Sequence, residues 1–325
     1  MMTVIQRPRN EEFSSMMLDY IIDTDSTITF KVVYGERTIL EEEYVPDAKY
    51  QVRIRRLGKF CENALWGVWC AGEVTWQSDL SGVFKFYIND VLDSQTIVVY
   101  NRYHVASPSI YSLCSSVANK VTYPGSREFV SGWANGTYTV TAYEGETMAE
   151  VDIAVANKQA ICTIDVSPDR IDAMFPDMEI ERYAITMGDS SMLFYVDRTK
   201  YAEKWVIRFK NMWDVPETVT CTGGLTMKSG QEESVGTMWG VERKFSVKVT
   251  DEYSVNSGTI HLQSDYKLWY ALSHSQEASI LVDGEWYPIL VSKQSYERKY
   301  KRSALQSVEI SFRFADSQHA NLIEL

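Results

Sequence analysis

The sequence predicts a mainly β protein with two or three antiparallel β-sandwich domains, the C-terminal one carrying a single flanking helix. Short runs of alternating apolar and polar residues recur from residue 27 to residue 314, separated by Gly, Pro, Asn and Asp. Aromatic residues make up 13% of the 325 residues, which favours strands over helices. One stretch alone, 264–273, has a convincing helical period, with Leu268, Trp269 and Leu272 on one stripe.

The expected first domain spans residues 1–117. Its first 26 residues are polar and weakly patterned, so we interpret them as an N-terminal arm. A hairpin is expected at 27–34 and 38–45, and a second one with a longer loop at 82–88 and 95–100. Between them, the strand 50–56 places Tyr50, Val52 and Ile54 on one face.

The expected second domain spans residues 118–200 and resembles a small immunoglobulin-like sandwich in its strand spacing. Residues 104–126 are rich in Ser, Pro, Ala and Tyr and are interpreted as a connector. Strands are expected at 128–133, 136–143, 149–155 and 160–166, followed by a hairpin at 183–187 and 192–196. Asn135, Gly136 and Gly145 supply the turns.

The expected third domain spans residues 201–325, and we predict that it folds independently because it supplies its own core. Its strands are expected at 204–209, 218–222 and 244–249, then, after the helix, at 278–282, 286–292 and 307–314. The expected core residues are Trp205, Ile207, Phe209, Phe245, Val247, Leu268, Leu272, Ile280, Val282, Ile289, Val291, Ile310 and Phe312.

The net charge of the chain argues against some classes of binding partner. A net charge of −12 argues against general binding of nucleic acids or anionic membranes, both of which require a positive surface. No apolar run approaches the roughly 20 residues of a membrane span. The N-terminus lacks the features of a secretory signal, so synthesis in the cytoplasm is expected.

The sequence shows no recognisable pattern of catalytic, metal-binding or phosphate-binding residues. The four His residues are scattered, the five Cys residues lack the spacing of a zinc site, and no nucleophile or phosphate-binding motif occurs. We therefore expect no catalytic residue, cofactor or metal, and free thiols such as a buried Cys162. A glycoside hydrolase remains an open alternative, because two carboxylates facing each other across a cleft leave no trace in a sequence.

Two groups of residues are candidates for an interface or for stacking on a ligand. Trp66, Trp69 and Trp76 cluster near glycines; aromatic platforms of this kind stack on sugars, although the same rings also serve to plug a sandwich core. They support the alternative of a carbohydrate-binding or adhesive module. Trp213 and Trp239 flank the Gly-rich polar segment 223–240 and are the better surface candidates.

A basic run stands out in this acidic chain. Arg298, Lys299, Lys301 and Arg302 lie between two expected strands, so they belong to a loop. Such a loop is either solvated or docks on an acidic patch of another copy of the chain.

The last third of the chain resembles structural proteins of bacteriophage tails and baseplates. The resemblance lies in residues 242–249 (ERKFSVKV), 283–291 (DGEWYPILV) and 308–315 (VEISFRFA), together with the helix between the first two. Residues 122–129 (TYPGSREF) are similar to virion-type proteins of prophage origin. The resemblance implies a non-enzymatic, virion-associated assembly subunit that contacts itself and other structural proteins, and it brings no catalytic residues.

Overall fold

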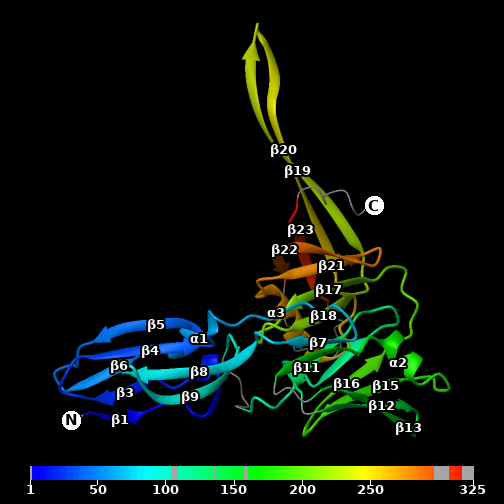
Figure 1. Cartoon of the computed structure of the whole chain (residues 1–325). Coiled ribbons are helices and arrows are strands. Elements are labelled where there is room, and N and C mark those ends of the chain that lie inside the picture. The colour runs from blue at the N-terminus through cyan, green and yellow to red at the C-terminus, as the bar shows by residue number, and fades with distance from the viewer. Residues whose placement is uncertain (1, 104–108, 135, 157–159, 296–306, 317–325) are drawn as a thin grey trace.

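The computed structural model describes residues 2–103, 109–134, 136–156, 160–295 and 307–316. Strands dominate this part of the chain, so the predicted fold class is confirmed (Figure 1). The helical segments are short: η1 (Ser14–Met16), α1 (Leu57–Glu62), α2 (Pro168–Met174), η2 (Gln263–Asp265) and α3 (Tyr266–Ser273).

The N-terminal part is a sandwich of two sheets. The larger sheet has the order β2 (Glu11–Phe13), β9 (Val91–Val99), β8 (Ser81–Ile88), β4 (Ile28–Tyr34) and β5 (Arg37–Tyr44); the smaller has β1 (Thr3–Gln6), β3 (Tyr20–Asp23) and β6 (Gln51–Ile54). The sheets meet where the Tyr20 ring packs on Phe30 and Phe86, with ring centroids 5.0 and 5.6 Å away. Aromatic pairs at such distances stabilise a core beyond their buried area.

Three local expectations for this part were wrong. The first 26 residues form no free arm, because β1, β2 and β3 belong to the two sheets; each is too short to display an alternation in sequence. The loop 89–94 is instead a two-residue turn, in which Asn89 and Asp90 both adopt positive φ and β9 begins at once. Tyr50 also has positive φ and is 66% exposed, so it leaves the buried face of Val52.

The middle part contains two sheets. One has the order β10 (Asn119–Thr122), β16 (Ser190–Val196), β15 (Arg182–Met187), β12 (Thr137–Glu144) and β13 (Thr147–Ala154); the other has β11 (Phe129–Trp133), β14 (Ile161–Asp165) and β7 (Val74–Gln77). β10 forms within the expected connector and runs parallel to β16. β7 crosses the predicted domain boundary, because it comes from the N-terminal span and pairs with β14.

The C-terminal part is one antiparallel sheet of seven strands. Its order is β18 (Pro216–Cys221), β17 (Trp205–Lys210), β21 (Ala278–Val282), β22 (Glu285–Ser295), β23 (Glu309–Phe314), β20 (Val241–Asn256) and β19 (Leu225–Met238). β18 and β19 lie at opposite edges but are joined by residues 222–224 alone, so the sheet must curl back on itself. α3 flanks this sheet with Leu268, Trp269 and Leu272 buried, as its stripe predicted.

A buried polar cluster joins the middle and C-terminal parts. Lys120 of β10 forms an ion pair with Glu128, and its ammonium also donates to the carbonyl and hydroxyl oxygens of Thr218 in β18, at 2.6 and 3.0 Å. All three side chains are buried. One continuous apolar core runs through the three parts. Independent folding of residues 201–325 remains a prediction.

Candidate interaction site: the projecting hairpin

The most exposed element of the molecule is the hairpin of β19 and β20, which leaves the body of the protein as a long arm (Figure 1). β20 pairs with β23 over residues 253–256 only. Beyond that point, from the pair Lys228 and Glu252 to the pair Met238 and Val241, the two strands have only each other as partners in the described part of the chain. The arm extends roughly 35 Å, at about 3.3 Å per residue.

The hairpin is held by local features of its own sequence. Lys228 lies directly opposite Glu252, and Lys244 forms an ion pair with Glu233 across the strands. Opposite charges in register stabilise an antiparallel pair. Near the tip the Phe245 ring covers Gly236, where a Cβ would lie 3.2 Å from the ring. The arm therefore forms without an apolar core beneath it.

The turn at the apex is strained at a tryptophan. Trp239 and Gly240 form a two-residue turn, with φ of 62° and 78°. Turns of this kind favour Asn-Gly, because positive φ costs a side chain other than Gly or Asn about 1–2 kcal/mol. Trp239 nevertheless occupies this position, and it is 90% exposed. A strained residue that gains no burial in its own chain indicates a function outside it.

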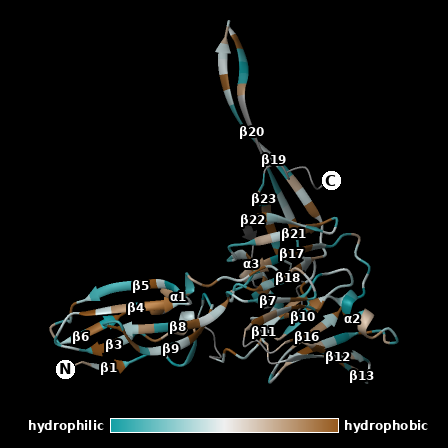
Figure 2. Ribbon diagram, in the orientation of Figure 1, coloured by the Kyte–Doolittle hydropathy of each residue, from teal (hydrophilic) through white to brown (hydrophobic). Residues whose placement is uncertain are grey.

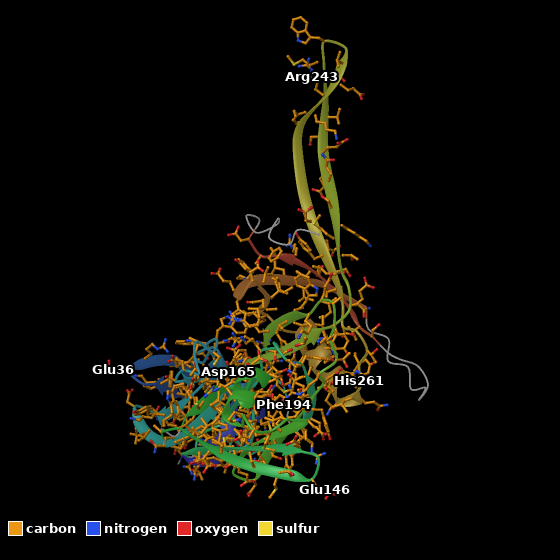
Figure 3. The ribbon with its side chains drawn as sticks, turned by 90° about the vertical axis from the view of Figure 1, so that its right-hand side faces the viewer. Glu36, Glu146, Asp165, Phe194, Arg243 and His261 are labelled. Carbon is orange, nitrogen blue, oxygen red and sulfur yellow. The ribbon has the colours of Figure 1, made fainter. Side chains whose placement is uncertain are left out.

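Further apolar side chains surround Trp239. We call the apolar tip the exposed set Val235, Met238, Trp239, Val241 and Phe245. Figure 2 shows hydrophobic segments along the hairpin, far from the sandwich interiors. In Figure 3 the labelled Arg243 lies near the apex of the arm, remote from Asp165 and His261 in the body. A hairpin alone is marginally stable in water, and exposed apolar groups gathered at its end favour a contact with another molecule.

The structure separates the two tryptophans that sequence analysis grouped. Trp239 is exposed as predicted, whereas the prediction for Trp213 was wrong, since it is only 6% exposed. The Oδ1 atom of Asn211 accepts a hydrogen bond of 2.9 Å from the backbone N–H of Trp213, and this closes the turn that carries the indole inward. Phe245, expected in the core, is 74% exposed, because its part of β20 lies in the arm.

Trp66, Trp69 and Trp76 have three different environments. Trp66 is 44% exposed, with the Arg37 guanidinium 6.0 Å from its ring centroid. Trp69 stacks on Arg208 of β17 at 4.4 Å. Trp76 of β7 is partly buried against the core. The three rings therefore do not share one exposed setting of the kind that a sugar platform requires.

Arg208 lies between two indoles. Trp286 of β22 stacks on its guanidinium at 4.4 Å, as Trp69 does. Burial lowers the pKa of Arg208 to about 10. The stack holds the loop after α1 against β17 and β22, so Trp69 has a packing role.

The basic run Arg298, Lys299, Lys301 and Arg302 lies outside the described residues.

Three of the cavities among the described residues have volumes of about 700, 340 and 30 Å³. Among the described residues, none of them is lined by two carboxylates, and no group of three or more His, Cys, Asp or Glu residues is placed to hold a metal. Cys162 is buried as expected, as are Cys61, Cys114 and Cys221, whereas Cys70 is half-buried. No helix in the described ranges is long and apolar enough to cross a membrane.

Sequence reasoning missed β19 and therefore the arm. The segment 225–238 is polar and contains glycines, so no strand was predicted there. The available signal was the register of the two flanking runs: Trp239 and Gly240 stand between two segments that can pair, with opposite charges at Lys228 and Glu252.

Comparisons with known proteins find weak structural likenesses. No family model matches the chain, and no curated protein matches it. A chain from the virion of a native gene transfer agent (GTA) particle is 10% identical at a TM-score of 0.25, covering 37% of this chain and 96% of that one. A chain from the tail of an empty GTA particle is 12% identical at a TM-score of 0.25, covering 34% of this chain and 91% of that one. The I9–I11 tandem from titin is 7% identical at a TM-score of 0.17, covering 98% of this chain and 91% of that one.

The resemblance to phage-like tail particles is therefore weak and partial.

Proposed function

We propose that this chain is a non-enzymatic structural subunit that assembles with further copies of itself through the apolar tip of the β19–β20 arm. The observation that carries the proposal is Trp239, which is 90% exposed at a strained turn position on an arm without a core. A phage-type tail or baseplate is the kind of particle that such a subunit would build, in agreement with the resemblance noted from the sequence.

The contact must be made with another molecule. The arm points away from the described body of its own chain, so its tip covers none of the surface that the described residues form (Figure 1). A tip that docks on a different surface of the next copy builds a ring or a filament rather than a closed pair. Aromatic residues at the centre of an interface contribute most of its binding energy.

Sedimentation velocity over a concentration series tests the proposal. The wild-type chain is expected to form species larger than a monomer as its concentration rises, whereas the variant Trp239→Asn is expected to remain monomeric. Asn suits the turn better than Trp does, so the variant removes the contact without disturbing the hairpin.

Tyr50→Asn is the matched control. Tyr50 is also an exposed aromatic residue at positive φ, but it lies in the N-terminal part. Its replacement is expected to leave the assembly unchanged. A wild-type chain that stays monomeric at every concentration would refute the proposal, and so would equal effects of the two substitutions.

A further inference from the structure

The cavity of about 700 Å³ lies where the three parts of the chain meet. One wall is a face of α3 formed by Lys267, Tyr270, Ala271 and His274, which follow the i, i+3, i+4, i+7 spacing of a single helix face. The opposite face of α3 is buried in the core. A volume of this size is typical of sites for small molecules.

The N-terminal part and the β17–β18 turn contribute a second wall. The backbone N–H of Arg102 donates to the carbonyl of Met212 at 2.8 Å, which fixes the two segments together. Tyr103 and Trp213 line the cavity beside them. Tyr266 and Tyr270 line it as well, so four rings offer aromatic surface to a flat ligand.

The charge of the lining has one sign. Arg102, Lys210 and Lys267 line the cavity together with His274, and none of the described residues that line it is Asp or Glu. This is notable in a chain whose net charge is −12. Concave surfaces lined by one sign of charge raise the local concentration of the opposite ion.

Two of these cations are available to a ligand. The ammonium of Lys210 is occupied, since it donates to the carbonyl of Gly67 at 2.6 Å. Arg102 donates to neutral groups, among them the amide oxygen of Gln276 at 3.1 Å, and Asp214 attracts its charge without forming an ion pair with it within 4 Å. Lys267 is exposed and forms no ion pair with a described residue.

The middle part supplies a hydroxyl without a partner. Ser116 lines the cavity, and its Oγ atom is buried without a hydrogen-bond partner among the described residues. A buried polar atom left unsatisfied is costly, and a ligand or water in the cavity would satisfy it.

We propose that this cavity binds a small organic anion with a flat aromatic body, its negative group facing Arg102 and Lys267. The rings of the lining take up the body of the ligand. The site is separate from the apolar tip, and it adds ligand binding to the assembly role.

Two probes that share the same rings test the role of charge. 1-Anilinonaphthalene-8-sulfonate is an aromatic anion, and N-phenyl-1-naphthylamine is its uncharged counterpart. Fluorescence titration of the full chain is expected to show saturable binding of the sulfonate with one site per chain. The uncharged probe is expected to bind at least about tenfold more weakly, and added salt should weaken the binding of the sulfonate alone.

Two substitutions locate the site. Lys267→Glu reverses one charge at the cavity and places an acid in the first turn of α3, where it is tolerated. It is expected to weaken sulfonate binding about tenfold or more, the effect of reversing a charge at a partly screened site. Ala271→Trp fills the space and is expected to abolish binding. Lys200→Glu, an equally exposed reversal away from the cavity, is the matched control.

The outcomes separate this proposal from the previous one. Equal effects of Lys267→Glu and Lys200→Glu, equal affinity for the two probes, or undiminished binding in Ala271→Trp would overturn it. The absence of saturable binding would do the same. The titration is repeated in Trp239→Asn, because the apolar tip is a second surface for the probe; binding that disappears in that variant would place the site on the arm and contradict the proposal.

Discussion

Replacing Trp239 with Asn should leave the arm as stable as before or slightly more stable. Asn adopts positive φ more readily than Trp, which releases about 1 kcal/mol of backbone strain. The substitution removes little buried apolar surface, because Trp239 is 90% exposed. The buried tenth of about 250 Å² is about 25 Å², or about 0.6 kcal/mol at about 25 cal/mol per Å². The net change is about 0.4 kcal/mol in favour of the variant.

Hydrogen exchange measures this change locally. The amides of β19 and β20 beyond Lys228 report opening of the arm, independently of unfolding elsewhere in a chain of several parts. A gain of about 0.4 kcal/mol slows their exchange about twofold. The comparison is made at dilution, where both proteins are monomers, so that protection by assembly does not contribute.

The opposite result would refute the reasoning. A tryptophan that anchors its own chain costs about 3–5 kcal/mol when it is truncated, which would speed exchange of the arm more than about a hundredfold. Faster exchange on that scale would show that Trp239 stabilises the hairpin and has no need of a partner.

Three further predictions concern the body of the protein. Leu272→Ala should cost about 2–5 kcal/mol, because the side chain is buried between α3 and the sheet; a negligible shift of the melting midpoint would contradict that packing. Glu128→Gln should cost about 3–5 kcal/mol by leaving Lys120 charged and buried, and the double variant with Lys120→Met should recover most of that loss in the same melt. Burial raises the pKa of Asp265 to about 7. Protonation therefore stabilises the fold below pH 4, and this contribution is lost as pH rises from about 4 through 7. Denaturation of Asp265→Asn at several pH values should lack that slope, and an unchanged slope would rule out Asp265 as its source.

The sequence was sufficient for most strands of the sandwiches and for α3. Alternation over five or more residues carries enough information to place a strand, as it did for 183–187 and 278–282. Very short strands such as β2 and β10 are defined by their partners in the sheet, which lie far away in the sequence. Their positions could not be read from local periodicity.

The candidate site residues, like the strands, were predicted only in part from the sequence. The exposure of Trp239 was predicted, because Trp239 flanks a Gly-rich polar segment. Trp213 has a similar sequence setting, but it is carried inward by a hydrogen bond from its own backbone to Asn211. The cavity gathers residues from 102 to 274, and no local pattern predicts such an assembly. The burial of a side chain at a turn, like the make-up of a surface built from distant segments, is thus decided by tertiary contacts that local sequence does not show.

Photo-cross-linking at residue 239 tests the central claim most directly. A benzophenone amino acid replaces Trp239, and in a second protein it replaces Tyr50, the matched exposed aromatic residue. Irradiation of the purified chain at assembling concentrations should yield covalent dimers from position 239, with the adduct on one defined segment of a second copy, and no dimers from position 50. Monomers alone from both positions, or equal yields of dimer from the two, would contradict an interface at the tip of the arm.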